Sequence, residues 1–315
     1  MNPTDIDARL ISISYETEGI NVYEFADAAG GMLPPAAAGS HIGLHLPGIG
    51  ERHYSLLPGN GTGRYSVGVL RDEAGRGGSR HVHDQLKVGQ VLRITPPRNL
   101  FPLTEDAAHS AFFAGGIGVT PLLNMAARLA ELGRPFEFHY ACRSRAGAAF
   151  LKEIAALTAP GLHFDDEAGS VFDFPSALSR VPAEAHLYCC GPVPMMDAFT
   201  ASARAQGFPD DRIHLEYFSA KEAPATAGGF TVELARSKRS IPVKPGQSIL
   251  AALRTAGVGT VSSCEQGICG ACEVRVISGV PDHRDSILSD AERAENTVMM
   301  LCCSGAKTPV LVIDL

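Results

Sequence analysis

The 315-residue sequence contains no tryptophan, no excess of positive charge and no cysteine before residue 142. Its formal net charge is −7 at pH 7, which argues against electrostatic binding to nucleic acid or to an anionic membrane surface. No apolar run reaches the roughly 18 residues that a membrane-spanning helix needs. The start, MNPTDIDARL, lacks the basic and then apolar stretches of a secretory signal. We therefore expect a cytoplasmic protein that binds neither nucleic acid nor membrane.

Apolar residues are abundant by comparison. They make up 45% of the sequence, whereas charged residues make up 19%, a composition that excludes wholesale disorder. At roughly 150 residues per domain, the length predicts two domains or three small ones.

The first segment, residues 1–103, reads as β-structure. Its short alternating runs are separated by Gly and Pro, and they are RLISISYET, INVYEFADA, SHIGLHLP, RHYSLL, RYSVGVLRD and QVLRITPP. Regular short strands of this kind predict a small antiparallel β-barrel. One short helix, near SRHVHDQL, interrupts the strands.

The pattern changes at residue 104. Over residues 104–219, buried-strand patterns such as SAFFAGG and AHLYCCG alternate with helical ones such as TPLLNMAARLAELG. Strand and helix in alternation with short loops predict a parallel, doubly wound α/β sheet. Within this segment we expect a helix over residues 146–157 and a strand over residues 162–168.

The remainder predicts a linker and a third domain. Residues 220–229, AKEAPATAGG, are rich in Ala, Gly and Pro and show no apolar periodicity, which favours a linker. Residues 230–315 open with a hairpin-like run and a helix, SILAALRTAG, followed by a Cys-rich loop and two strands. They predict a compact α+β domain.

The cysteines are clustered, with three in residues 142–190 and five in residues 264–303. Such clustering in a chain without a secretory signal favours metal or redox chemistry over disulfides. Cys264-x4-Cys269-x2-Cys272, followed by Cys302, matches the ligand spacing of a plant-type 2Fe–2S cluster. Four cysteines also satisfy tetrahedral zinc, but structural zinc sites favour two C-x2-C pairs and only one is present. We interpret Cys303 as a buried apolar residue.

Glycines at 267 and 270 free the backbone between these ligands, so that amides can point at sulfur. Residues 262–272, SSCEQGICGAC, together with MMLCCSG around Cys302, resemble a plant-type ferredoxin domain, which implies a β-grasp fold for the third segment. Residues 228–315 contain nine Lys and Arg and nine Asp and Glu. The domain is therefore neutral, which weakens any argument for docking through an acidic face.

Two motifs in the barrel segment suit a flavin. Arg52-His53-Tyr54-Ser55 can offer a guanidinium to a phosphate, an aromatic face to a flat ring and a hydroxyl to a ring nitrogen. Residues 75–80, GRGGSR, form a Gly-rich turn that leads into a helix, where free amides can bind a phosphate. Taken alone, each motif also has an ordinary interpretation, as half-buried packing and as a solvated loop.

Two further motifs suit a dinucleotide. Residues 114–121, AGGIGVTP, follow a strand and open a helix, and Cys190-Gly191-Pro192 ends a later strand. Ligands of such sheets bind at the carboxyl ends of the strands, so the two segments can converge on one crevice. The first motif is not the G-x-G-x-x-G fingerprint, and Cys190 can equally be a core thiol.

Taken together, RxYS, GRGGS, GGIGVTP, CGP and the later EYF resemble the ferredoxin–NADP reductase superfamily. With a ferredoxin domain at the carboxyl end, the whole chain resembles phthalate dioxygenase reductase and vanillate demethylase reductase. These are reductase components of two-component Rieske oxygenases, and we expect this chain to be a monomer. The resemblance implies that the barrel binds FMN, the middle domain binds NADH and the ferredoxin passes electrons to a Rieske-type oxygenase. FMN rather than FAD follows because GRGGSR runs straight into the helix without an aromatic platform for adenine.

The resemblance also assigns residues. Ser55, Thr120 and Cys190 would act where flavin and nicotinamide meet, and Phe218 would stack near the flavin ring. The flavin-binding residues would be Arg52, His53, Tyr54, Ser55, Gly68, Val69, Leu70, Gly77, Gly78, Ser79, Thr120 and Phe218. The dinucleotide-binding residues would be Gly115, Gly116, Gly118, Arg143, Ser144, Cys190, Gly191 and Pro192. The cluster ligands would be Cys264, Cys269, Cys272 and Cys302.

The indications disagree on whether the protein uses NADH or NADPH. The strand FEFHYA ends in Cys142-Arg143-Ser144-Arg145, where NAD selection commonly uses an acid and a 2′-phosphate needs Arg. Those residues alone favour NADPH, whereas the resemblance favours NADH. We expect NADH. A flavin would convert the two electrons of a hydride into single electrons for the cluster. The alternatives are a reductase for a haem or di-iron oxygenase, and a binding protein that carries a redox-sensing or zinc module.

Overall fold

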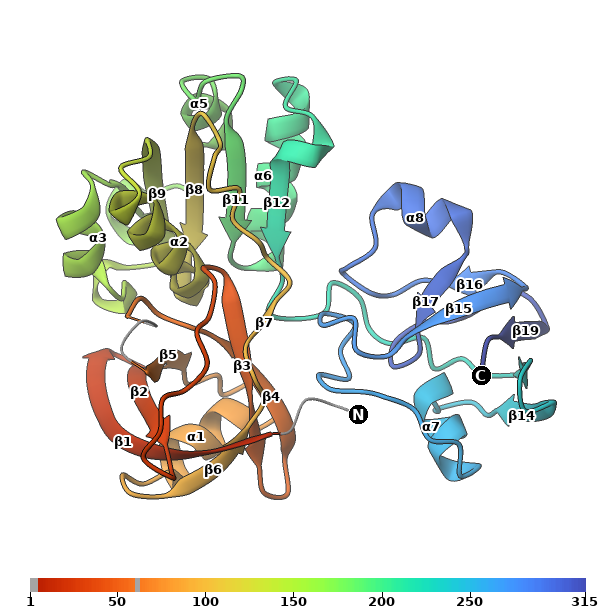
Figure 1. The fold of residues 1–315 in the computed structure, drawn as a ribbon. Coiled ribbons are helices and arrows are strands. Elements are labelled where there is room, and N and C mark those ends of the chain that lie inside the picture. The colour runs from red at the N-terminus through yellow and green to blue at the C-terminus, as the bar shows by residue number, and fades with distance from the viewer. Residues whose placement is uncertain (1–4, 60–62) are drawn as a thin grey trace. The chain divides into compact units, whose positions relative to one another are not determined.

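The computed structural model describes residues 5–59 and 63–315. The chain forms two compact units, and the division between them falls between Glu216 and Tyr217 (Figure 1). No helix in these two ranges is long and apolar enough to cross a membrane. The prediction that the chain starts without a secretory signal was made on residues 1–10, and residues 1–4 lie outside the described part.

The first unit begins with one antiparallel sheet. Its strands follow the order β4-β3-β6-β1-β2-β5, with β7 paired to β3. A bridge between Leu56 and Val67 joins the two ends of this order, and Tyr23 and Phe25 are fully buried inside. The predicted barrel is thereby confirmed. The strands are β1 (Ile6–Thr17), β2 (Ile20–Asp27), β3 (Ser40–Leu46), β4 (Gly50–Ser55), β5 (Arg64–Leu70), β6 (Val91–Ile94) and β7 (Arg98–Asn99).

The sheet that follows is wholly parallel and has the order β10-β9-β8-β11-β12. Every residue of β8 is buried, as a central strand covered on both faces requires. Helices α2 and α3 pack together, as do α5 and α6, and the predicted doubly wound α/β domain is confirmed. The strands are β8 (Ser110–Gly115), β9 (Phe136–Cys142), β10 (Gly161–Phe164), β11 (His186–Cys190) and β12 (Ile213–Glu216). The helices are α2 (Val119–Glu131), α3 (Leu151–Leu157), α5 (Phe174–Leu178) and α6 (Val193–Ala205).

Two expected elements differ from the structure. The strand over residues 162–168 ends at Phe164, and Asp165–Ala168 form the short helix α4. Three acidic residues lie in its first turn, where they favour a helix amino end. The helix expected from residue 146 begins instead at Leu151, because Phe150 adopts a left-handed conformation with φ 61°.

The barrel and the parallel sheet share one hydrophobic core. Ile20, Ala38, Leu57 and Phe101 from the barrel segment pack in the same buried cluster as the residues of α2. This shared burial explains why the two segments form a single unit, although their folds differ.

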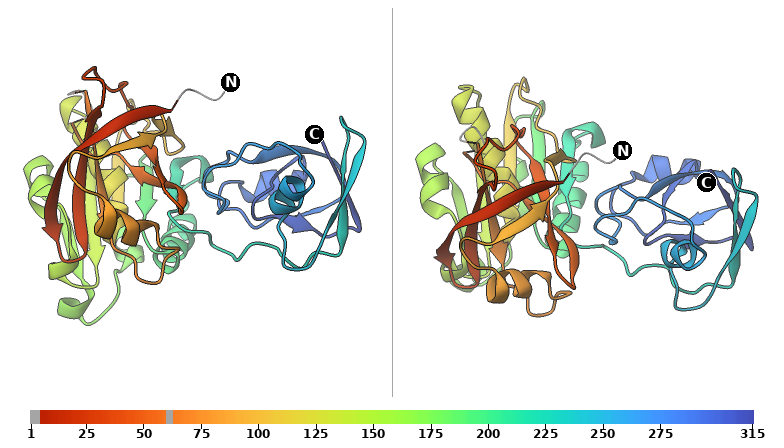
Figure 2. Two further views of the ribbon diagram at one scale, coloured as in Figure 1. Left: turned by 90° about the horizontal axis from the view of Figure 1, so that it is seen from below. Right: turned by 60° about the horizontal axis from the view of Figure 1, so that its bottom comes forward.

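The second unit is a mixed sheet with the order β14-β13-β19-β15-β17, in which β13 pairs with β19 in parallel. Helix α7 (Ile249–Thr255) buries Ile249, Leu250 and Leu253, and this arrangement confirms the predicted β-grasp. The strands are β13 (Phe230–Leu234), β14 (Arg239–Val243), β15 (Glu273–Ser278), β16 (Pro281–Asp282), β17 (Val298–Met300), β18 (Gly305–Ala306) and β19 (Val310–Ile313). A second helix is α8 (Asp290–Glu295). Figure 2 shows the sheet and the helices of this unit from two further sides.

Residues 220–229 lie along the second unit. The amide of Lys221 donates to Ser286 Oγ at 3.2 Å, and the amide of Ala225 donates to the carbonyl of Cys303 at 2.7 Å. The segment predicted as a linker is therefore bonded to the second unit from Lys221 onward. The name connector is used below for residues 220–229.

Candidate functional site

The four predicted cluster ligands lie in one region of the second unit. Cys264, Cys269, Cys272 and Cys302 are each no more than 8% exposed. The amide of Gln266 donates to Cys264 Sγ at 3.3 Å, which puts a backbone N–H at a ligand sulfur. Buried sulfurs with amides pointing at them are the environment expected around an iron–sulfur cluster.

Gly267 is required between these ligands. It has φ 70°, and a Cβ there would lie 2.6 Å from Cys303 Sγ. A side chain would therefore be both strained and crowded against the residue that follows the last ligand.

The thiols fall into two pairs. Contact with Cys269 and burial raise the pKa of the Cys264 thiol, and contact with Cys302 and burial raise the pKa of the Cys272 thiol. Two pairs of thiols suit two irons, whereas tetrahedral zinc needs all four at one ion. The donor set therefore fits a 2Fe–2S cluster better than zinc.

The barrel motifs meet at the amino end of α1 (Gly78–Gln85). A Cβ at Gly78 would lie 2.7 Å from Cγ of Arg52, so RxYS and GRGGS are adjacent. The helix is preceded by Gly77 with φ 85°, and no side chain caps it. Uncapped amides beside a guanidinium form a site suited to a phosphate.

The other barrel residues are placed as follows. His53 stacks on His41 with ring centroids 4.9 Å apart and lies 2.8 Å from Glu51 Oε1. Burial raises the pKa of the Tyr54 phenol. The Val69 side chain lies in the barrel core and its carbonyl contacts His83 at 2.9 Å, so only its backbone is available to a flavin. Leu70 is 39% exposed, and the Ser79 hydroxyl accepts the amide of Asp72 at 3.0 Å.

Gly68 joins the barrel to the nucleotide motif. A Cβ at this glycine would lie 3.1 Å from Cγ2 of Thr120 and 3.1 Å from Cζ of Phe150. The Thr120 hydroxyl donates to the carbonyl of Ile117 at 3.0 Å. Thr120 therefore lies against the strand predicted to line the flavin, and its role at the flavin stays a prediction. Phe150 was not found from the sequence, where it resembles any apolar helix residue.

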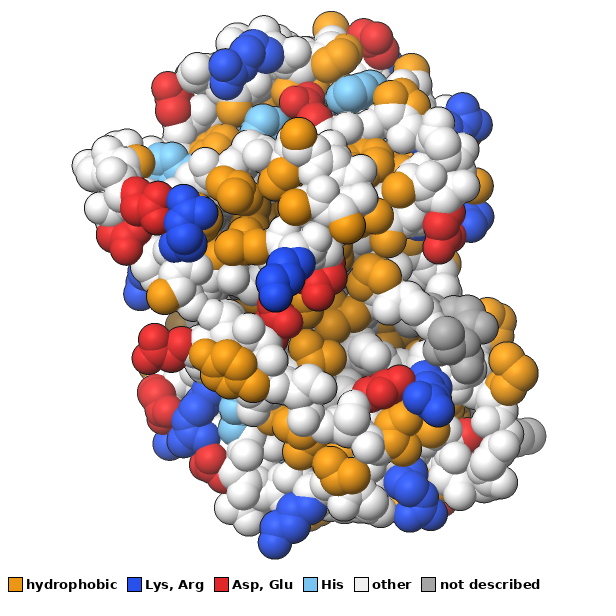
Figure 3. All heavy atoms as spheres, turned by 90° about the vertical axis from the view of Figure 1, so that its left-hand side faces the viewer, with side chains coloured by type: hydrophobic (Ala, Val, Ile, Leu, Met, Phe, Trp, Pro, Cys, Tyr) orange, Lys and Arg blue, Asp and Glu red, His pale blue; other side chains and the backbone are white. Residues whose placement is uncertain are grey.

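The two nucleotide motifs converge. A Cβ at Gly115 would lie 3.1 Å from Cα of Gly191, and one at Gly118 would overlap the carbonyl oxygen of Cys190. Gly116 has φ 52° and faces open space, and Pro192 precedes α6. The convergence places the AGGIGVTP and CGP turns together at the carboxyl ends of β8 and β11. Figure 3 shows a face of the first unit on which hydrophobic side chains gather around a hollow between its upper and lower halves.

Glu216 is the acidic group of this region. Its Oε2 lies 3.5 Å from Ser55 Oγ, and it pairs in register with Cys190 across β11 and β12. The residue is partly exposed, but its carboxyl group is surrounded by protein, and this burial raises its pKa to about 8. Burial and the nearby Glu216 together raise the pKa of the Cys190 thiol. Glu216 was part of the EYF motif in the sequence, but only Phe218 received a role.

The remaining predicted residues belong to the turn after β9 and to the second unit. Arg143 is exposed and Ser144 Oγ accepts the amide of Gly147 at 3.3 Å. Arg145 forms a two-point ion pair with Glu167, at 2.8 and 2.9 Å. Phe218 is 40% exposed and belongs to the second unit, so its place beside a flavin stays a prediction.

Comparisons with known proteins agree with this site. Residues 232–307 match the model of the 2Fe-2S iron-sulfur cluster binding domain. The chain is 47% identical to phenoxybenzoate dioxygenase subunit beta of Ectopseudomonas oleovorans, over 98% of this chain and 97% of that protein. The solved structure of phthalate dioxygenase reductase superposes with a TM-score of 0.75 at 36% identity, covering 99% of this chain and 98% of its own. The chain belongs to the phthalate dioxygenase reductase family.

Vanillate O-demethylase oxidoreductases are also similar to this chain, so the resemblance read from its motifs is confirmed. The reductase is also similar to part of a type IV self-sufficient cytochrome P450 monooxygenase, with a TM-score of 0.85 and 37% identity over 99% of this chain and 41% of that one. It is an oxidoreductase of an oxygenase system, and it transfers electrons by way of a flavin and a 2Fe–2S cluster.

The cluster assignment predicts opposite results for two adjacent cysteines. Cys302→Ser should remove the visible 2Fe–2S absorption, because Cys302 pairs with Cys272. Flavin reduction, followed with an artificial oxidant, should persist because every residue assigned to the flavin except Phe218 lies in the first unit. Cys303→Ser should keep the cluster, because we interpret Cys303 as a buried apolar residue, and its contacts with the Met300 carbonyl and the Ser304 hydroxyl can also be made by a serine. Loss of the cluster in the Cys303→Ser variant alone would show that the ligand was misassigned.

The raised pKa of Glu216 predicts a pH dependence. Its carboxyl is neutral below about pH 8 and charged above, and the added charge opposes hydride arrival at a flavin next to Ser55. The rate of flavin reduction, measured by stopped flow, should therefore fall as pH rises through about 8. Glu216→Gln should flatten this profile, whereas Glu105→Gln, at a surface pair with Arg128, should keep it. An unchanged profile in the Glu216→Gln variant would exclude Glu216 as the titrating group.

Proposed function

We propose that the protein is the reductase component of a Rieske-type oxygenase, and that it passes electrons from NADH through FMN and the 2Fe–2S cluster to that oxygenase. The observation that carries the proposal is the presence in one chain of an uncapped helix end beside Arg52, two converging glycine turns at the carboxyl ends of β8 and β11, and four buried cysteines. A flavin, when bound, accepts a hydride and releases its electrons singly.

FMN is supported by the amino end of α1. Its uncapped amides and the Arg52 guanidinium form a cradle for one terminal phosphate, as a mononucleotide requires. Ser55 and Thr120 would orient the ring from two sides, since both lie next to residues of the barrel and of the parallel sheet. Glu216, neutral at pH 7, can hold a proton at its carboxyl oxygen close to Ser55.

NADH is supported by the environment of Arg145. The sequence offered two arginines at the expected ribose position, but Arg145 donates two hydrogen bonds, from Nε and Nη2, to the carboxylate of Glu167. Hydrogen bonding to Glu167 is the main cause that raises the pKa of Arg145, and Asp166 adds to it. A 2′-phosphate would have to displace this acid and would meet its charge, so the pair disfavours NADPH.

This arrangement predicts how nucleotide preference can be changed. The wild type should prefer NADH by kcat/KM, and Arg145→Ala should change that constant little. Glu167→Gln should free Arg145 and improve kcat/KM for NADPH by roughly tenfold or more, because a charge-assisted contact to phosphate becomes available. In the Glu167→Gln, Arg145→Ala double variant the gain should vanish. A wild type that prefers NADPH would overturn the NADH proposal.

The acceptor is proposed from the relatives, since the protein belongs to reductases of oxygenase systems and one similar protein is named as a dioxygenase subunit. A second candidate is a haem oxygenase, favoured by the likeness to a self-sufficient cytochrome P450 monooxygenase. A similar protein is also named as the beta subunit of a haem-dependent oxidative N-demethylase.

The two acceptors can be separated directly. The NADH-reduced protein should be mixed anaerobically with a purified Rieske-type oxygenase and, separately, with a purified haem oxygenase. Bleaching of the oxygenase's Rieske absorption would support the proposal. Reduction of a haem Soret band, with no Rieske protein reduced, would establish the second candidate instead.

A further inference from the structure

The connector makes specific contacts that are explained neither by its composition nor by the electron-transfer role. It was predicted as a linker because it is rich in Ala, Gly and Pro, and a linker needs no specific contacts. In the structure it is bonded to the second unit through several residues, among them Lys221, Glu222, Ala225 and Thr226. Three of these bonds lead toward the cluster loop, residues 264–272, or toward Cys302.

The first bond reaches the residue after a cluster ligand. The amide of Ala225 donates to the carbonyl of Cys303 at 2.7 Å, and Cys303 follows Cys302 directly. Ala225 also packs on β18, because a Cβ at Gly305 would lie 2.8 Å from the Ala225 Cβ. The connector therefore fixes the peptide that follows the fourth ligand.

The second contact is an ion pair. Glu222 Oε2 lies 2.6 Å from Arg284 Nη1, and Arg284 also binds Asp282 at 2.9 Å. Next to it, the amide of Lys221 donates to Ser286 Oγ at 3.2 Å. Both contacts hold the segment 284–286.

That segment is itself attached to the cluster loop. The amide of Ser286 donates to the carbonyl of Gly267 at 2.8 Å, and Cα of Asp285 lies 3.0 Å from the place of a Gly267 Cβ. The buried Asp285 carboxylate accepts the amides of Ile287 and Leu288 at 3.1 and 2.8 Å. A chain of short contacts thus runs from the connector through residues 284–286 to the loop that holds three ligands.

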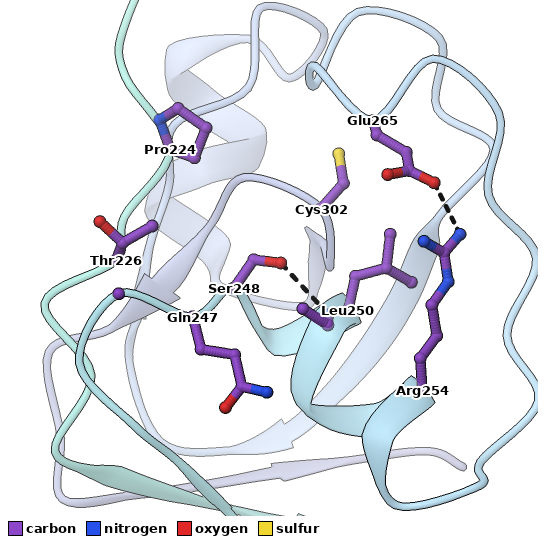
Figure 4. A pocket seen from close by; sticks show the side chains of 10 residues that line it. Pro224, Thr226, Gln247, Ser248, Leu250, Arg254, Glu265 and Cys302 are labelled. Atoms are coloured by element: carbon purple, nitrogen blue, oxygen red, sulfur yellow. Dashed lines mark hydrogen bonds and ion pairs between the residues drawn. The ribbon is translucent and has the colours of Figure 1, made fainter. Parts of the chain in front are cut away.

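The connector also forms part of the wall around Cys302. Pro224 and Thr226 line a cavity of about 300 Å³ together with Ser248, Arg254, Glu265 and Cys302. Figure 4 shows Pro224 and Thr226 on one side of this cavity and the Arg254–Glu265 pair on the other, with the Cys302 thiol between them. The carbonyl of Thr226 accepts the amide of Gly246 at 2.8 Å, which closes this wall.

We propose that residues 221–226 of the connector are a positioning element of the 2Fe–2S cluster. They hold the cluster loop and the peptide around Cys302 in place, and they limit solvent access to both. Ala225 acts through the Cys303 carbonyl, and Glu222 acts through Arg284 and Ser286. Backbone orientation and solvent access are among the factors that set cluster retention and reduction potential. The proposal rests on the cluster alone and stands whatever nucleotide, flavin or oxygenase the protein uses.

The test compares two alanines in the full-length holoprotein. Ala225→Pro removes the amide that binds Cys303, whereas Ala223→Pro changes an exposed alanine whose amide makes no hydrogen bond among the described residues. Both positions adjoin Pro224, so the two variants impose similar backbone restriction. The readouts are the rate at which an iron chelator bleaches the cluster absorption and the midpoint potential from a redox titration followed by electron paramagnetic resonance.

Ala225→Pro should lose the cluster about tenfold faster than the wild type, the usual scale for removing an outer contact of a metal site, with a shifted potential. Ala223→Pro should match the wild type in both readouts, and flavin content should be unchanged in both variants. Wild-type behaviour of Ala225→Pro, or an equal loss in both variants, would overturn the proposal.

The ion pair gives a second test, which also serves if Ala225→Pro does not fold. Glu222→Gln should speed cluster loss, and in an Arg284→Gln background the same change should add nothing, because its partner is gone. If Glu222→Gln leaves the rate of cluster loss unchanged, or speeds it equally in the wild-type and Arg284→Gln backgrounds, the role assigned to the ion pair is wrong.

Discussion

Four buried thiols within one small domain are stable as thiolates only when metal neutralises them, and the second unit is organised around that constraint. Contact between the paired sulfurs and their burial raise the pKa values of Cys264 and Cys272, which means that the protein alone disfavours their charged forms. Iron supplies the missing positive charge. The loop then needs glycine at 267, where any side chain would meet Cys303, and amides that point at sulfur.

The first unit meets a different requirement, which is to bring two cofactor sites together across two folds. A shared core unites the barrel with the parallel sheet, and Gly68 lets Thr120 approach the barrel strand. Ser55 from the barrel and Glu216 from the last strand of the sheet meet at 3.5 Å. Apart from Phe218, the residues assigned to the flavin and to the dinucleotide therefore lie in one compact unit.

Much of this could be predicted from local sequence signals. The barrel strands, the order of strands and helices after residue 104 and the C-x4-C-x2-C spacing each depend on short-range patterns. The structure confirms the elements that they predict, except that the helix expected from residue 146 begins at Leu151 and the strand expected over residues 162–168 ends at Phe164. Contacts between distant segments could not be predicted in the same way. Glu167 lies 22 positions from Arg145, so its contact with the guanidinium appears only when β10 pairs with β9. Residues 220–229 have the composition of a linker, and only their backbone bonds show otherwise. Phe150 could not be distinguished from the helix that it precedes, because a left-handed residue with an ordinary apolar side chain leaves no mark in the sequence.

The central claim is that one chain holds both a flavin, which carries two electrons, and a 2Fe–2S cluster, which carries one, and that the same donor reduces both. An anaerobic titration of the purified protein with NADH, followed by visible absorption, tests it most directly. A flavin takes two electrons and a 2Fe–2S cluster takes one, so complete bleaching should require about 1.5 NADH per chain. An end point at about one NADH, with the cluster bands unchanged or absent, would contradict the account.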